Sequence, residues 1–144
     1  MTTKGPDSAH HVPTGVTPAT VSALGKLSEA LEIVEEARGR LYGFHRLTGM
    51  ADLALGEAVD ELRNAGHEQL ADKIEAELVG RNIIEGRWTF QLVEDYDGGY
   101  YALFRELEKL ARDELAEGRR HLFEAQMKEE RRTHGRKHHE ATPR

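Results

Sequence analysis

Cysteine is absent from the sequence, which excludes disulfide bonds, thiolate metal sites and cysteine nucleophiles. Long apolar runs are absent as well, whereas a membrane-spanning helix requires about 18 such residues in succession. The N-terminus has neither the basic start nor the apolar stretch of a secretory signal. We therefore expect a soluble, cytoplasmic protein with no membrane span.

Motifs of several common catalytic sites are also missing. There is no Gly-x-Ser-x-Gly elbow, and "GRNIIEGRW" lacks the Lys-Ser/Thr pair of a phosphate-binding P-loop. None of the histidines follows a glutamate by three residues, as the ligand pairs of ferritin-like di-iron bundles require. These absences favour a protein that is not an enzyme.

What the sequence does contain is charge. Charged residues make up 32% and apolar residues 38% of the chain, a balance typical of helices with narrow apolar stripes and wide solvated faces. The net charge is −6, with acidic residues gathered in 50–97 and basic ones near the C-terminus. Because glutamates interrupt the basic end, we do not expect nucleic-acid binding, and binding of an anionic polymer by the tail is a third interpretation only.

Composition divides the chain into three segments. Residues 1–17 are rich in glycine and proline and poor in apolar side chains, so we expect a disordered N-terminal arm. Residues 18–132 carry apolar residues at three- and four-residue steps and form the expected helical bundle domain. Residues 133–144 form the expected mobile tail, which is basic and rich in histidine.

The apolar spacing predicts four helices, at about 18–46, 50–65, 67–92 and 97–132. We expect Gly66 to end the second helix, Asp97 to cap the last one, and Gly39 and Gly43 to mark close packing or a kink. The predicted fold is therefore an all-α antiparallel bundle of about four helices, three long and one short.

The short second helix leaves part of the longer helices uncovered, because helix length grows by about 1.5 Å per residue. An uncovered apolar stripe normally packs against another subunit. We therefore expect an elongated, self-associating protein, a homo-oligomer with a dimer favoured, that also binds a protein partner of unknown identity.

A heptad repeat runs along the first helix, with core positions at Leu24, Leu27, Leu31, Val34 and Leu41. Arg38 and His45 also fall on core positions of this heptad. Either the apolar stripe drifts around the helix, or these two polar side chains are buried.

One loose metal site can be drawn from acidic and imidazole side chains. Glu114, Glu117 and His121 share one face of the last expected helix, at steps of three and four. With His45 or Glu85 from neighbouring helices they could hold iron, manganese or zinc. The other interpretation is a solvated helix flank, and in that case we predict no cofactor.

Aromatic residues gather in "GRNIIEGRWTFQLVEDYDGGYY", which contains the only tryptophan. Aromatic side chains at a helix joint usually close the end of a core. The alternative is a ligand pocket formed by Trp88, Arg81 and Tyr101. Overall the sequence favours a non-enzymatic helical interaction or scaffold module that acts through self-association and partner binding. The alternative function is a metal- or small-ligand-binding bundle, oxidoreductases included.

Overall fold

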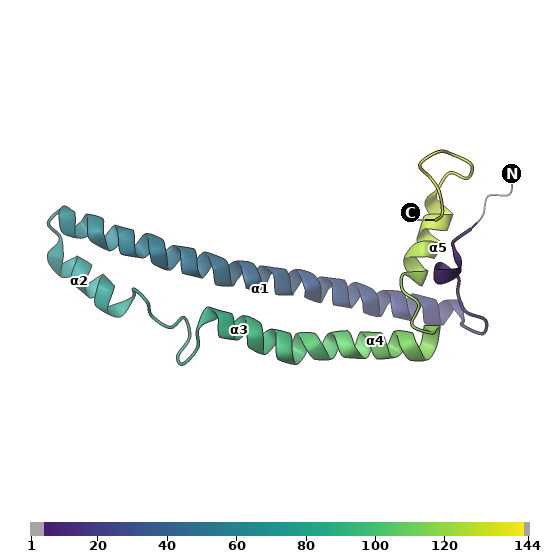
Figure 1. The fold of residues 1–144 in the computed structure, drawn as a ribbon, viewed down its shortest axis with the longest axis horizontal. Helices are drawn as coiled ribbons and strands as arrows, with labels where there is room; N and C mark the ends of the chain where they lie inside the picture. The colour runs from purple at the N-terminus through teal and green to yellow at the C-terminus, as the bar shows by residue number, and fades with distance from the viewer. Residues whose placement is uncertain (1–4, 143–144) are drawn as a thin grey trace. The chain divides into compact units, whose positions relative to one another are not determined.

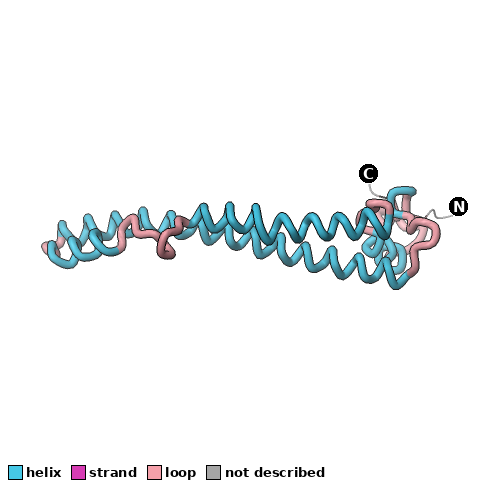
Figure 2. The backbone as a smooth tube through the Cα atoms, turned by 90° about the horizontal axis from the view of Figure 1, so that it is seen from below, coloured by secondary structure: helices cyan, strands magenta, loops and turns pink. Residues whose placement is uncertain are grey.

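The computed structural model describes residues 5–142, and within this range it is all-α, without a strand (Figure 1 and Figure 2). The predicted fold class is confirmed, whereas the antiparallel arrangement and self-association stay predictions. In chain order the helices are α1 (Pro18–Asn64), α2 (Glu68–Glu77), α3 (Thr89–Tyr96), α4 (Ala102–Ala116) and α5 (Leu122–Arg131). A short 3-10 helix, η1 (Ser8–His10), precedes α1, and a short π-helical segment, η2 (Asp97–Tyr101), joins α3 to α4. In this part of the chain no helix combines the length and the apolar character needed to cross a bilayer.

The chain divides into two compact units. The first unit comprises residues 1–34 and 103–144, and the second comprises residues 35–102. Helix α1 therefore contributes its first turns to the first unit and its remaining turns to the second.

Helix α1 continues through the point where we predicted a break. The prediction that one helix ends near Arg46 and another begins near Met50 is wrong, since both residues lie within α1. The heptad explains the difference: its core positions continue after His45 at Thr48, Asp52, Leu55, Val59 and Leu62. Packing along this row offsets the cost of about 1 kcal/mol that a glycine imposes inside a helix. Gly66 follows the helix with a φ of 90°, as predicted for its C-terminal end.

The long helix predicted for residues 67–92 is instead two short helices joined by a loop. Gly80 and Gly86 take φ values of 72° and 74°, which a helix does not accommodate. The backbone N–H of Gly80 donates a hydrogen bond to the Asp52 carboxylate at 2.8 Å, so the break leaves this group satisfied. The "WTFQLV" segment is helical from Thr89 onward, as predicted.

Asp97 does not cap a new helix. Its backbone is helical, with φ −61° and ψ −41°, and α3, η2 and α4 follow one another directly. Gly98 and Gly99 lie within η2, so the chain stays helical where we predicted the boundary between two helices. The Asp97 carboxylate does not cap a helix and instead pairs with Arg38.

The last predicted helix is interrupted after Ala116. Glu117, Gly118 and His121 all have positive φ values, and the Gly118 N–H donates to the Arg112 carbonyl oxygen at 2.9 Å. The positive φ at Gly118 is typical of a glycine that follows a helix end. Helix α5 then begins at the buried Leu122.

Residues on both sides of this break contribute to the core of the first unit. Val21, Leu24, Ala116 and Leu122 are buried together, and Val12, Val16, Ala111 and Phe123 pack against them. Residues that we assigned to the N-terminal arm therefore contact the core. Residues 1–4 of that arm and 143–144 of the tail lie outside the described range, and disorder of the arm and mobility of the tail stay predictions.

In the second unit, the apolar stripe of α1 keeps its course and the Arg38 and His45 side chains are half-buried. The heptad row from Arg38 to Leu62, which we call the inner row, is half-buried or buried at every position, so the stripe does not drift. Arg38 donates two hydrogen bonds to the Asp97 carboxylate, at 3.0 and 2.9 Å. Nδ1 of His45 lies 2.7 Å from the Thr89 hydroxyl oxygen. Arg38 and His45 are thus accommodated because each has a partner.

Substitution by alanine is expected to have opposite effects on stability at Gly25 and at Gly39. A Cβ at Gly25 lies 2.6 Å from Cγ of Phe123, whereas a Cβ at Gly39 or Gly43 meets nothing within 4 Å, so the close packing expected there is wrong and the alternative of a kink stays a prediction. We expect Gly25→Ala to lower the free energy of unfolding by about 1 to 3 kcal/mol. Gly39→Ala is expected to raise it by up to about 1 kcal/mol, since alanine favours helix. Urea unfolding measures both, and a Gly25→Ala protein as stable as the wild type contradicts the close packing.

The pair between Arg38 and Asp97 predicts a pH dependence of stability. The hydrogen bonds from Arg38 hold the pKa of the Asp97 carboxyl below its ordinary value of 3.8. A lowered folded-state pKa stabilises the protein above pH 3.8, and this stabilisation is lost as the pH falls through the folded-state pKa. We expect Asp97→Asn to be less stable than the wild type at neutral pH, with a difference that shrinks in acid. Urea unfolding over a pH series tests this, with Glu36→Gln as the exposed control, and a difference independent of pH contradicts it.

Candidate functional site

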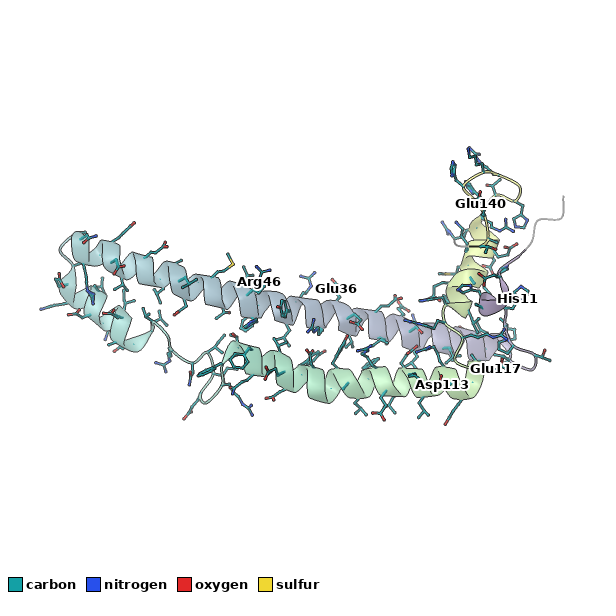
Figure 3. All side chains as sticks on the ribbon, in the orientation of Figure 1. His11, Glu36, Arg46, Asp113, Glu117 and Glu140 are labelled. Carbon is teal, nitrogen blue, oxygen red and sulfur yellow. The ribbon has the colours of Figure 1, made fainter. Side chains whose placement is uncertain are left out.

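The outer side of α1 carries a second heptad in the second unit, distinct from the inner row. We call it the outer row, and its members, all solvent-exposed, are Ala37, Arg40, Phe44, Leu47, Ala51, Ala54 and Ala58. Alternating steps of three and four residues place them on one stripe of the helix. Leu47 keeps 64% of its surface exposed. Glu36 flanks this stripe, and Figure 3 shows it on the side of α1 that faces away from α3.

Side-chain size and charge are distributed unevenly along the outer row. The bulky Phe44 and Leu47 lie in the middle of the row, and Ala51, Ala54 and Ala58 follow toward the C-terminal end. Arg40 precedes the bulky pair and forms an exposed ion pair of 3.1 Å with Glu36. The exposed Glu57 and Glu61 lie on either side of Ala58 in the sequence, and they form no ion pair within residues 5–142.

A shorter apolar stripe lies on α4 in the first unit. Leu103, Leu107 and Leu110 follow one another at steps of four and three and are about half exposed. The buried side of α4 carries Glu108, which accepts hydrogen bonds from Ser28 at 3.2 Å and from Arg112 at 2.9 Å. The inward face of α4 is thus polar at this point, while leucines face solvent.

An open cleft of about 790 Å³ lies in the second unit, between α1 and the loop that joins α2 to α3. Its lining is Thr48, Gly49, Ala51, Asp52, Leu55, Leu78, Gly80, Arg81, Asn82, Ile83, Trp88 and Thr89. Trp88 and Arg81, two members of the pocket expected from the sequence, both line it. Tyr101 does not, because its hydroxyl donates to the Glu35 carboxylate at 2.6 Å.

Sequence reasoning missed the α1 side of this cleft. Thr48 and Asp52 occupy inner-row positions, so a heptad continued past the expected break would have placed them on the same face as His45. The break assumed at Gly49 hid that signal.

The structure does not assemble the metal site drawn from the sequence. Helix α4 ends before Glu117, so the prediction that Glu114, Glu117 and His121 share one helix face is wrong. Figure 3 labels Glu117 beyond the end of α4, and its carboxylate lies 3.3 Å from Arg119. In the described range no three histidine, aspartate or glutamate side chains are placed to hold one metal ion.

The two remaining candidates for metal ligation lie in the second unit. His45 contacts Thr89, and Glu85 is exposed in the loop between α2 and α3.

Comparisons with protein-family models, curated proteins and solved structures give no match to this chain. Its own surfaces are therefore the basis for a functional proposal. Among the outer row, the α4 stripe and the cleft, the outer row is the longest regular apolar feature on the described surface.

Proposed function

We propose that the protein is a non-enzymatic helical interaction module that forms a homodimer through the outer row of α1. The observation that carries the proposal is the unbroken outer row, in which every position is exposed. Apolar surface removed from water contributes roughly 25 cal/mol per Å², and an exposed apolar stripe normally marks a binding surface. A cytoplasmic location, as expected from the sequence, is part of this proposal.

The spacing of the outer row favours another helix as the binding partner. A heptad keeps its apolar positions facing a second helix, whose side chains fit between them as knobs into holes. Alanine at most positions lets two helix backbones approach closely. The outer row therefore supports a helical coiled-coil contact better than the insertion of one extended peptide.

The α4 stripe supports binding of a further protein. It lies in the first unit, while the outer row lies in the second, so pairing through α1 does not use these leucines. A module with one surface for its own copy and another for a partner acts as a scaffold. The identity of that partner is outside this proposal.

Leu47→Glu is expected to abolish the dimer, because it places a charge in the middle of the apolar contact. Leu53→Glu is the matched control: Leu53 is even more exposed, at 73%, but lies on α1 outside the outer row. Sedimentation equilibrium of both variants at tens of micromolar measures the association, with circular dichroism to show that α-helix is retained. Equal effects of the two substitutions, or a wild-type monomer, would count against the proposal.

Native mass spectrometry of untagged protein, purified without a metal column or chelator, tests the same proposal against a metal-binding function. We expect a dimer mass without stoichiometric metal. A bound metal ion would instead favour the metal-binding interpretation.

A second candidate function, binding of a small ligand, is supported by the cleft. Its volume of about 790 Å³ falls in the range typical of ligand sites, roughly 300 to 1,000 Å³. Trp88 offers an exposed ring. Arg81 donates to the Glu77 carbonyl oxygen at 3.3 Å and forms no ion pair with any described carboxylate. A planar aromatic anion matches this combination.

Fluorescence of the single tryptophan tests the cleft directly. Naphthalene-2-carboxylate is expected to quench Trp88 at micromolar to millimolar concentrations, and Arg81→Gln to weaken the effect about tenfold, since a charged hydrogen bond is lost. The neutral naphthalene-2-methanol is the control ligand. Equal titrations for the acid and the alcohol would argue against the anion site.

A further inference from the structure

We infer that the two copies pack their outer rows antiparallel, with the twofold axis at the level of Gly49. This inference rests on the proposed self-association and specifies its geometry. In this arrangement, residues equally far before and after Gly49 meet across the contact.

Side-chain size is the first reason for this register. Phe44 then packs against Ala54 of the second copy, and Leu47 against Ala51 of the second copy, so each bulky side chain meets a small one. A parallel dimer instead places Phe44 against Phe44 and Ala51 against Ala51, which overfills one layer and leaves space in another. Because stable interfaces are packed as densely as a protein core, an overfilled layer and an underfilled layer both destabilise a dimer.

Charge is the second, independent reason. In the antiparallel register Arg40 lies at the level of Ala58 of the second copy, between the partner's Glu57 and the partner's Glu61. The exposed ion pair between Arg40 and Glu36 of the same helix contributes little to stability, so the guanidinium can exchange it for contacts with these carboxylates. A parallel dimer brings Arg40 against Arg40 and Glu61, the next position of the same heptad, against Glu61, which is repulsive.

Neighbouring antiparallel registers fit less well. Sliding one copy by a heptad in one direction places Phe44 opposite Leu47, so that two bulky side chains share a layer. Sliding it in the other direction places Phe44 opposite Glu61 and leaves Ala51 facing Ala54. The register centred on Gly49 also brings Met50 close to Met50 of the second copy, where a flexible thioether fills an irregular gap well.

Distances between spin labels test the inference. The chain has no native cysteine, so Arg46→Cys and Asp60→Cys each give a single labelling site. Both residues are exposed, lie outside the outer row, and occupy the same heptad position two repeats apart, so each is the control for the other. With a helix rise of 1.5 Å per residue, the antiparallel register separates the two labels along the axis by about 9 Å at position 46 and about 33 Å at position 60.

Pulsed electron spin resonance on the full-length dimer is expected to give a clearly longer distance for Asp60→Cys than for Arg46→Cys. Equal distances at the two sites would show a parallel dimer and overturn the inference, while the proposed self-association would stand. A shift of one heptad would give axial separations at positions 46 and 60 of about 20 and 22 Å in one direction, and of about 2 and 44 Å in the other, and either result would overturn the register. Labelled protein that remains monomeric, like the unlabelled chain, would overturn the proposed function itself.

Discussion

The polar groups of the inner row fix how the second unit packs on α1. Arg38, His45 and Asp52 follow one another at intervals of one heptad, and each finds a partner in residues 80–97. The partners fall in sequence number as the α1 residues rise: Asp97, then Thr89, then Gly80. A slip of one heptad would keep leucines in contact but leave half-buried charges without partners, which costs more than it returns. The row therefore specifies one alignment where leucines alone would tolerate several.

Glycine shows why helix boundaries were harder to predict than the fold class. The heptad of apolar residues is a long, redundant signal, and it gave the all-α class correctly. Gly49 remains inside α1, whereas Gly80 and Gly86 lie in the loop between α2 and α3, although the residue type is the same. The difference depends on tertiary contacts: the inner row continues past Gly49, while the broken backbone at Gly80 is stabilised by Asp52. Such contacts connect residues far apart in the chain, and local patterns do not contain them.

The candidate surfaces differ in how visible they were in the sequence. Trp88 and Arg81 lie on the same loop, so their neighbourhood in sequence was enough to bring them together. Glu114 was separated from Glu117 and His121 by the end of α4 at Ala116, after which Glu117 and Gly118 take positive φ values. The outer row escaped notice because alanines give a weak hydrophobic signal beside the leucine-rich inner stripe. Exposure, which only the folded structure provides, revealed it.

The alanine-rich half of the outer row bears on how assembly responds to abundance. Each alanine offers little apolar area, so the proposed pairing through this surface would be weaker and shorter-lived than through a leucine zipper of equal length. For such a reversible pair, the paired share rises most steeply when the protein's own concentration is near the dissociation constant. Modest changes in synthesis or turnover would then switch the population between single and paired chains, and the protein would report its own dosage without any added signal.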